Sequence, residues 1–329
     1  MKRLLSVLCI TGFLLGSITG CGKEEVTLEQ PYDIYETTGS LGLGTTVSAG
    51  AQEYFSKDLC VADDVSLGTD TTDSQVAEGA GTFNLATNEI VYAKNIYERL
   101  YPASTTKILT AYIALKYCTD LSQTVTISEN AANQASDSSV CGLHAGDVIR
   151  MDNLLYGMML RSGNDAAIAI AESISGSVEE FAALMNKEAA ALGATQSHFV
   201  NPNGLPDENH YTSVYDLYLI FNECIKHDDF VKIIMEKSHT AKITGNDGTV
   251  RSITWEPTNF YATGDAKKPD NVTVIGGKTG TTQLAGNCLI LLTKDKNDHP
   301  YISIVMKADT KPLLYKDMTA IVEAIPENN

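Results

Sequence analysis

The spacing of apolar positions changes along the chain and separates a helical middle from a strand-rich end. Between residues 102 and 226, apolar side chains recur every three or four positions, which predicts helices with one buried face. After residue 228, short apolar and β-branched runs separated by polar turns predict strands. Helices grouped in the middle and adjacent strands near the end favour an α+β domain with an antiparallel sheet.

Sequence signals give approximate bounds for most of these elements. The first helix follows Pro102, with its apolar stripe at Ile108, Ala111, Tyr112, Leu115 and Cys118. Further helices are expected over 152–160, over 164–173 with Gly176 beyond its end, from a capping box at Ser177 to Gly193, from a cap at Thr212 or Ser213 to about 226, and over 311–325. A hairpin is expected over 82–92 and strands over 249–255, 272–275, 287–293 and 301–307.

The first twenty residues have the pattern of a secretory signal. Lys2 and Arg3 precede an apolar stretch over 4–15, which is shorter than the roughly 20 residues of a spanning helix. The segment Ile18-Thr-Gly-Cys21 resembles a bacterial lipobox, in which the cysteine is lipidated and becomes the mature N-terminus. We therefore predict a lipoprotein signal peptide over 1–20 and lipidation of Cys21. The alternative is an ordinary signal peptide cut nearby, with Cys21 incidental.

Residues 21–54 differ in composition from the rest of the chain. They are rich in Glu, Thr, Gly and Ser and show no sustained period, which predicts a tether leading to a domain over 55–329. The alternative is a partly ordered segment in which Tyr32 and Tyr35 pack. Formal net charge is −17, and loss of Lys2 and Arg3 with the signal peptide makes it −19. An acidic chain without a basic run excludes nucleic acid as a partner.

Five cysteines remain after the leader: Cys60, Cys118, Cys141, Cys224 and Cys288. They form no C-x-x-C pair and are odd in number, so they predict neither a zinc site nor a complete disulfide framework. We interpret most of them as small core residues.

The tetrapeptide Ser104-Thr-Thr-Lys107 lies at the first turn of the helix after Pro102. A spacing of three places both side chains on one helical face, roughly 5–6 Å apart at Cβ, so the lysine amine can reach the hydroxyl. Burial, the helix N-terminus and a second nearby cation would all lower the pKa of Lys107 and let it act as a base. Taken alone, the motif is weak, and Ser104 would be interpreted as a helix cap.

Two further motifs follow in the chain. Ser162-Gly-Asn164 lies between two apolar helices and could present a hydroxyl and an amide to a cleft, or simply cap the next helix. A rival Ser128-Glu-Asn130 follows a strand-like run and is better explained as a local cap. Lys278-Thr-Gly280 follows the strand over 272–275, where its ammonium and hydroxyl could hold a carboxylate, or it is a strand end with a solvated lysine.

Ser-x-x-Lys, Ser-x-Asn and Lys-Thr-Gly in this order are the signature of penicillin-binding proteins and class A β-lactamases. The chain resembles the low-molecular-mass penicillin-binding proteins that act as serine-type D-Ala-D-Ala carboxypeptidases. The resemblance covers about residues 55–325 and is strongest over 101–107, 160–167, 198–205, 211–213 and 277–282. It implies a β-lactamase/DD-peptidase-like transpeptidase fold, an antiparallel sheet flanked by helices with an all-helical subdomain.

The resemblance also implies roles for individual residues. Ser104 would attack the carbonyl between two D-alanines of a peptidoglycan stem pentapeptide, with Lys107 as base, Ser162 relaying a proton to the leaving amine and Asn164 orienting Lys107. Lys278 and Thr279, with Gly280 and Thr281 beside them, would bind the substrate. The N–H groups of Ser104 and Thr281 would form the oxyanion hole. Water would hydrolyse the ester without metal or cofactor, and β-lactams would acylate the same serine.

Several alternatives stay open. A class A β-lactamase should carry a Glu-x-x-Leu-Asn loop, and the chain has Asn201-Pro-Asn-Gly204 instead. A zinc peptidase is disfavoured, because His210 beside Asp207 and Glu208 is better explained as a surface histidine. A non-catalytic β-lactam or cell-wall sensor and a DD-endopeptidase share the motifs. Many family members continue into a β-rich domain and a membrane helix, whereas this chain ends about fifty residues after Lys278, so we expect the lipid at Cys21 to be the membrane anchor.

Overall fold

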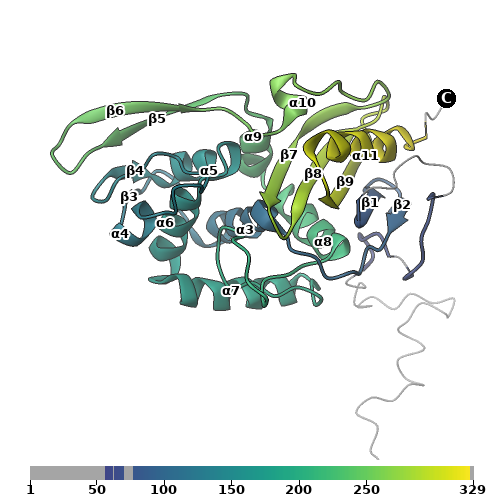
Figure 1. Cartoon of the computed structure of the whole chain (residues 1–329), viewed down its shortest axis with the longest axis horizontal. Coiled ribbons are helices and arrows are strands. Elements are labelled where there is room, and N and C mark those ends of the chain that lie inside the picture. The colour runs from purple at the N-terminus through teal and green to yellow at the C-terminus, as the bar shows by residue number, and fades with distance from the viewer. Residues whose placement is uncertain (1–55, 62, 70–76, 327–329) are drawn as a thin grey trace, which may run out of the picture. The chain divides into compact units, whose positions relative to one another are not determined.

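The computed structural model describes residues 56–61, 63–69 and 77–326. The predicted signal peptide, the lipidation site at Cys21 and the tether over 21–54 lie outside the described residues, so all three stay predictions. Figure 1 shows the sheet formed by β1, β2 and β7–β9 beside the group of helices α3–α9.

One antiparallel sheet joins strands from the beginning and the end of the domain. Its strand order is β2-β1-β9-β8-β7, and each neighbouring pair is antiparallel. The bounds are β1 Gly79–Asn84, β2 Glu89–Lys94, β7 Thr273–Thr282, β8 Gly286–Lys294 and β9 Pro300–Ala308. The predicted hairpin over 82–92 and the strands over 287–293 and 301–307 are confirmed.

Alternate residues of β8 enter two different hydrophobic clusters. Cys288, Ile290 and Leu292 pack with the helices of the middle of the chain, whereas Leu289 and Leu291 pack under α11 Lys311–Glu323. Successive side chains of a strand point to opposite faces of the sheet. The sheet is therefore covered on both faces, as the position of α11 over β8 and β9 in Figure 1 illustrates.

The middle of the chain is helical, as predicted for residues 102–226. Its elements are the 3₁₀ turn η1 Ala103–Thr106, α3 Lys107–Tyr117, α4 Glu129–Ala132, α5 Met151–Leu160, α6 Asn164–Ser175, α7 Val178–Ala191, α8 Val214–Cys224 and α9 Asp228–Met235. The expectation of strands after residue 228 was wrong at first, because Asp228–Met235 forms helix α9, which buries Phe230, Ile233 and Ile234 on one face. A short helix, α10 Phe260–Thr263, precedes β7.

The helical part also carries a second sheet, which the sequence predicted only in part. Its order is β3-β4-β5-β6, with β3 Thr124–Thr126, β4 Val148–Arg150, β5 His239–Thr244 and β6 Val250–Trp255. Strand β6 was expected, and β3 lies in the strand-like run noted before Ser128. Strands β4 and β5 were not expected. Strand β4 has three residues, too few for an alternation of apolar and polar positions to be visible, and it forms by pairing with distant partners.

The bounds predicted for β7 were wrong. The sequence placed Lys278-Thr-Gly280 after a strand over 272–275, but the strand continues to Thr282 and includes the motif. Pairing with β8 continues from Thr273 opposite Lys294 to Thr282 opposite Gly286. Cross-strand pairing in the folded protein thus overrides the low strand propensity of the glycines in this segment.

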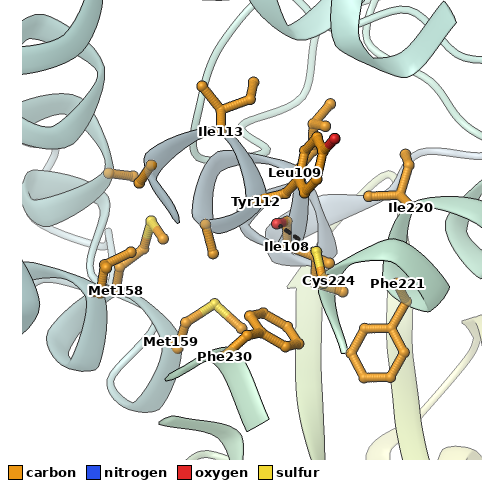
Figure 2. Close-up of a cluster of buried hydrophobic side chains, with 14 of the residues drawn as sticks. Ile108, Leu109, Tyr112, Ile113, Met158, Met159, Ile220, Phe221, Cys224 and Phe230 are labelled. Atoms are coloured by element: carbon orange, nitrogen blue, oxygen red, sulfur yellow. Dashed lines mark hydrogen bonds between the residues drawn. The ribbon is translucent and has the colours of Figure 1, made fainter. Parts of the chain in front are cut away.

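Helix α3 is buried around most of its circumference instead of along one stripe. Leu109, Ile113 and Ala114 are buried together with the predicted Ile108 and Tyr112. Figure 2 shows Ile108, Leu109, Tyr112 and Ile113 surrounded by residues of other helices: Met158 and Met159 of α5, Ile220, Phe221 and Cys224 of α8, and Phe230 of α9. A helix that is apolar all round is a core helix.

The predicted helix caps agree with the structure. The side chain of Ser177 accepts from the N–H of Glu180, and Ser213, rather than Thr212, caps α8. Ser128 caps α4 by accepting from Ala131 N–H, as expected of the rival Ser-x-Asn segment. Gly176 ends α6 in the left-handed conformation.

The five cysteines of the described domain are free thiols, and all but Cys118 are buried, as predicted for small core residues. In the part of the chain that the structure describes, no helix combines the length and the apolar character needed to cross a membrane.

Removal of the Ile113 side chain tests the central position of α3. We expect Ile113→Ala to lower the free energy of unfolding by about 2–5 kcal/mol, because Ile113 is fully buried and the substitution leaves a cavity. Urea unfolding of the two proteins measures the change. Val250→Ala is the control, since Val250 is 64% exposed and should change stability by less than about 0.5 kcal/mol. Equal losses in both variants would contradict the assignment.

Candidate active site

Ser104 lies on the 3₁₀ turn η1, which leads directly into α3. The backbone N–H and the hydroxyl of Thr105 both donate to the carbonyl of Pro102, at 3.2 and 2.7 Å, and fix this turn. The N-cap residue of α3 is Thr106, so Ser104 does not cap that helix. Its side chain is free for another role.

The side chain of Lys107 is fully buried and its Nζ faces three oxygen acceptors. Nζ lies 3.0 Å from Ser104 Oγ, 2.8 Å from Asn164 Oδ1 and 2.6 Å from the carbonyl oxygen of Asn203. The first two contacts join residues that the sequence analysis singled out. The third comes from the connection between α7 and α8 and was not predicted, because a backbone carbonyl leaves no mark in a sequence.

The segment Ser162-Gly-Asn164 forms the junction of α5 and α6. Ser162 has φ of 63°, a left-handed conformation that is uncommon for a residue other than glycine and that concentrates at functional sites. Its Oγ accepts a hydrogen bond from Lys278 Nζ at 2.9 Å. The junction therefore presents a hydroxyl to Lys278 and an amide oxygen to Lys107.

Strand β7 brings the third motif beside the other two. Lys278 is 1% exposed, so the interpretation as a solvated lysine is wrong. Its Nζ donates to Ser162 Oγ and, at 2.8 Å, to the carbonyl of Thr279. A Cβ atom at Gly280 would lie 3.0 Å from the backbone nitrogen of Ser104. The strand thus runs directly past the backbone of Ser104, at a distance that favours glycine.

The threonines of β7 are held by neighbouring side chains. The hydroxyls of Thr279 and Thr258 lie 2.5 Å apart. Thr281 donates from its hydroxyl to Asn287 Oδ1 of β8 at 3.1 Å. Both threonines line the space in front of Ser104.

Both lysines have lowered pKa values. Burial is the main cause for Lys107, and the positive charge of Lys278 adds to it, so that the pKa of Lys107 lies well below its ordinary value. Burial lowers the pKa of Lys278 to about 7. Desolvation and a like charge both disfavour an ammonium. The lowered pKa favours the neutral amine of Lys107, which is the form that can accept a proton.

Ser104 lies where two cavities meet. Ser104, Ser139 and Thr281 line both of them. The first has a volume of about 300 Å³ and is also lined by Arg161, Ser162, Thr279 and Lys311. The second has a volume of about 380 Å³ and is also lined by Asn164, Asn203, Gly204 and Thr282. A ligand can thus approach Ser104 from two sides.

His210 is not the surface residue that the sequence analysis expected. It is 1% exposed, and its Nε2 lies 2.8 Å from Thr106 Oγ1, beside Lys107. Its Nδ1 accepts from the N–H of Val200 at 3.2 Å. The expectation was wrong because the acidic neighbours Asp207 and Glu208 suggested an exposed loop, whereas the connection folds back onto η1 and α3.

The described residues thus bring all eight predicted residues of the Ser-x-x-Lys, Ser-x-Asn and Lys-Thr-Gly-Thr segments to one place. Cys21 lies outside them. Among residues 56–61, 63–69 and 77–326, no group of three or more His, Cys, Asp or Glu side chains is placed to hold a metal ion.

Comparison with known proteins agrees with this geometry. The family model described as D-alanyl-D-alanine carboxypeptidase matches residues 69–310. The D-alanyl-D-alanine carboxypeptidase DacF of Bacillus subtilis is 35% identical over 71% of this chain and 58% of its own length. DacA of Haemophilus influenzae is 34% identical over 67% of this chain and 54% of its own length. The chain therefore spans little more than half the length of these two relatives.

A relative of similar size is the D-alanyl-D-alanine carboxypeptidase of Streptomyces sp. K15, 31% identical over 75% of this chain and 86% of its own length. The crystal structure of the Streptomyces K15 DD-transpeptidase matches with a TM-score of 0.70 and 29% identity, over 77% of this chain and 98% of that one. The antiparallel sheets flanked by helices are those of an α+β DD-peptidase fold. The chain thus belongs to the D-alanyl-D-alanine carboxypeptidase family of low-molecular-mass penicillin-binding proteins.

Proposed function

We propose that this protein is a serine-type D-Ala-D-Ala carboxypeptidase. It removes the terminal D-alanine from peptidoglycan stem pentapeptides through an acyl-enzyme at Ser104, and β-lactams acylate the same residue. The observation that carries the proposal is the 3.0 Å contact between Ser104 Oγ and the Nζ of Lys107, a buried amine with a lowered pKa. Covalent catalysis requires a nucleophile that is hydrogen-bonded to a base, and a third group that orients the base. Here Asn164 is the third group, since its Oδ1 accepts a hydrogen bond from Lys107 Nζ.

The reaction follows from these contacts. Ser104 Oγ attacks the carbonyl carbon between the two D-alanines and gives its proton to the neutral amine of Lys107. The negative charge that develops on the carbonyl oxygen is stabilised by the N–H groups of Ser104 and Thr281. When the C–N bond breaks, Ser162, which accepts a hydrogen bond from Lys278, relays the proton held by Lys107 to the leaving amine, and Lys107 is neutral again. Water then attacks the ester and gives a proton to Lys107. The bond to Ser104 Oγ breaks, Lys107 returns the proton to Ser104, and the shortened peptide leaves.

The two cavities have different roles in this reaction. Ser162 lines the cavity of about 300 Å³, so the leaving D-alanine occupies that side. The acyl part of the peptide occupies the cavity of about 380 Å³ along Asn164 and Thr282. The carboxylate of the leaving D-alanine is held by Thr279 and by the charge of Lys278.

Two exposed cations strengthen recognition of that carboxylate. Arg161 and Lys311 line the leaving-group cavity, and the structure shows both side chains exposed. Lys278 is buried and donates to Ser162, so it does not offer its hydrogen bonds directly to the substrate carboxylate. The exposed guanidinium of Arg161 and the exposed ammonium of Lys311 can donate to that carboxylate instead. We assign them to binding rather than to the chemical step.

We further propose that the protein is exported and attached to a bacterial membrane through a lipid on Cys21. The positive start, the apolar stretch over 4–15 and the lipobox-like Ile18-Thr-Gly-Cys21 support this. The tether over 21–54 would let the domain over 55–329 reach peptidoglycan, the partner whose stem peptides it trims.

Substitution of Ser104 tests the nucleophile. We expect Ser104→Ala to form no covalent adduct with a fluorescent penicillin and to release D-alanine from a stem pentapeptide about a million-fold more slowly, near background. Gel fluorescence and a D-alanine assay measure the two. The control is Ser128→Ala, which removes the cap of α4 and costs about 1 kcal/mol of stability without changing either activity. An adduct that persists in Ser104→Ala excludes the mechanism, and a wild-type protein that forms the adduct but releases no D-alanine is a sensor.

Substitution of the exposed cations tests carboxylate recognition. We expect Arg161→Ala and Lys311→Ala each to raise KM about 10-fold for a peptide ending in D-Ala-D-Ala, because each removes a charge-assisted hydrogen bond worth about 1.5 kcal/mol. KM for the corresponding C-terminal amide, which lacks the negative charge, should not change. Lys242→Ala on β5 is the matched control for an exposed lysine. Equal effects on acid and amide would contradict this role.

Substitution of Cys21 tests the anchor. We expect Cys21→Ser to lose incorporation of labelled fatty acid in a bacterial host and to move from the membrane fraction to the soluble one, because serine offers no thiol for lipidation. Fractionation and labelling measure the change. Cys118→Ser should remain in the membrane. Retention of label in Cys21→Ser would show that the lipobox assignment is wrong.

A further inference from the structure

The connection between α7 and α8 folds tightly onto the helix of the nucleophile. The hydroxyl of Thr110 in α3 donates to the carbonyl of Pro202 at 2.7 Å. Gly204 has φ of +86°, and a Cβ there would lie 1.8 Å from the carbonyl oxygen of Ala103. Even a methyl group would push this turn away from η1. The turn thus packs against η1 so closely that there is no room for a side chain at position 204.

The carbonyl of Asn203, which this turn presents to Lys107, restricts the direction of the lysine lone pair. A neutral amine has two N–H bonds and one lone pair. The oxygens of Asn164 and Asn203 can only accept, so together they use both N–H bonds. The lone pair then has one remaining partner, the hydroxyl of Ser104 at 3.0 Å. The Asn203 carbonyl thereby contributes to catalysis by orienting the base.

His210 joins the start of this turn to the residue next to the base. Because Nδ1 accepts from Val200 N–H, the neutral ring carries its hydrogen on Nε2 and donates it to Thr106 Oγ1. The ring of Phe199 packs edge-on against it, with centroids 5.5 Å apart. Both ring nitrogens of His210 are therefore hydrogen-bonded, Nδ1 to Val200 of the turn and Nε2 to Thr106, which precedes Lys107.

We propose that neutral His210 is a positioning residue, which fastens the turn over 200–204 to Thr106 and so keeps the Asn203 carbonyl where it directs the lone pair of Lys107 at Ser104. This inference rests on the proposed function, because it assigns His210 a part in activating the nucleophile. His210 contacts neither the substrate nor the reacting atoms and acts through the turn.

The charges around His210 agree with a neutral ring. The pKa of His210 is lowered to about 4, mainly by burial. The negative charge of Asp207 raises this pKa, and the positive charges of His198 and Lys107 lower it further. A proton on Nδ1 would remove the acceptor of Val200 N–H. The unfolded chain binds this proton at higher pH than the folded one, so stability falls as the pH falls from about 6.5 towards 4.

The test measures acylation of the full-length protein by a fluorescent penicillin as a function of pH. Glutamine keeps a donor near the Nε2 position but offers no acceptor at the Nδ1 position. We expect His210→Gln to lower the second-order rate constant of acylation about 100-fold at pH 7, because the base is misdirected. The acidic limb of the pH profile should move to lower pH, since the ammonium of Lys107 loses an acceptor that stabilised it.

Two further variants separate positioning from a general loss of structure. Thr106→Val removes the other partner of the ring and should move the acidic limb in the same direction, and the double variant should be no worse than the stronger single one. His239→Gln is the matched control. This half-buried histidine of β5 lies 2.6 Å from Asn153 Oδ1, and its loss should lower Tm without moving the limb.

The outcomes are distinct. If the wild-type protein is acylated and a variant, His210→Gln or Thr106→Val, has the same acylation rate and the same acidic limb, the role of His210 is wrong while the proposed function stands. If His210→Gln does not fold, the measurement on the folded Thr106→Val protein decides. A wild-type protein that is not acylated at all would overturn the proposed function and, with it, the role of His210.

Discussion

The burial of the Lys107 amine is the constraint on which the rest of the site depends. An ammonium out of water is costly unless it is bonded or loses its proton. The protein surrounds Nζ with Ser104 Oγ, the amide oxygen of Asn164 and the carbonyl of Asn203. These acceptors come from η1, from the start of α6 and from the connection between α7 and α8. One buried amine therefore determines how three parts of the helical region meet.

A second buried lysine, Lys278, connects the five-stranded sheet to the groups around Lys107. Lys278 of β7 bonds to Ser162 at the junction of α5 and α6, and its charge helps to lower the pKa of Lys107. The two amines differ in their surroundings. Lys107 contacts Ser104 directly, whereas Lys278 contacts Ser162. In the proposed reaction, the two buried amines therefore lie on different sides of the site, Lys107 at the nucleophile and Lys278 beside the leaving group.

The apolar packing around α3 makes this electrostatic arrangement rigid. Side chains of α5, α8 and α9 enclose the helix, as Figure 2 shows, and alternate residues of β8 complete the core behind β7. A lysine with a lowered pKa is useful as a base only if its acceptors stay in place, and close packing supplies that. The strained backbone of Ser162 and the tight approach of Gly204 to η1 are consistent with a site held by its surroundings.

Local patterns in the sequence determined the helices up to residue 226 and the last helix α11, the long strands of the main sheet, the caps at Ser177 and Ser213, and the residues of the three motifs. Each of these depends on side chains a few positions apart. What only the tertiary structure decided depends on contacts between distant segments: the continuation of β7 through Lys278, the sheet formed by β3–β6, and the burial of His210 and of the Asn203 carbonyl. A backbone carbonyl has no residue type of its own, and the exposure of a histidine depends on what folds over it. For that reason the sequence could single out Ser104, Lys107 and Asn164, while the contact of the Asn203 carbonyl with Lys107 and the burial of His210 became visible only when the chain was folded.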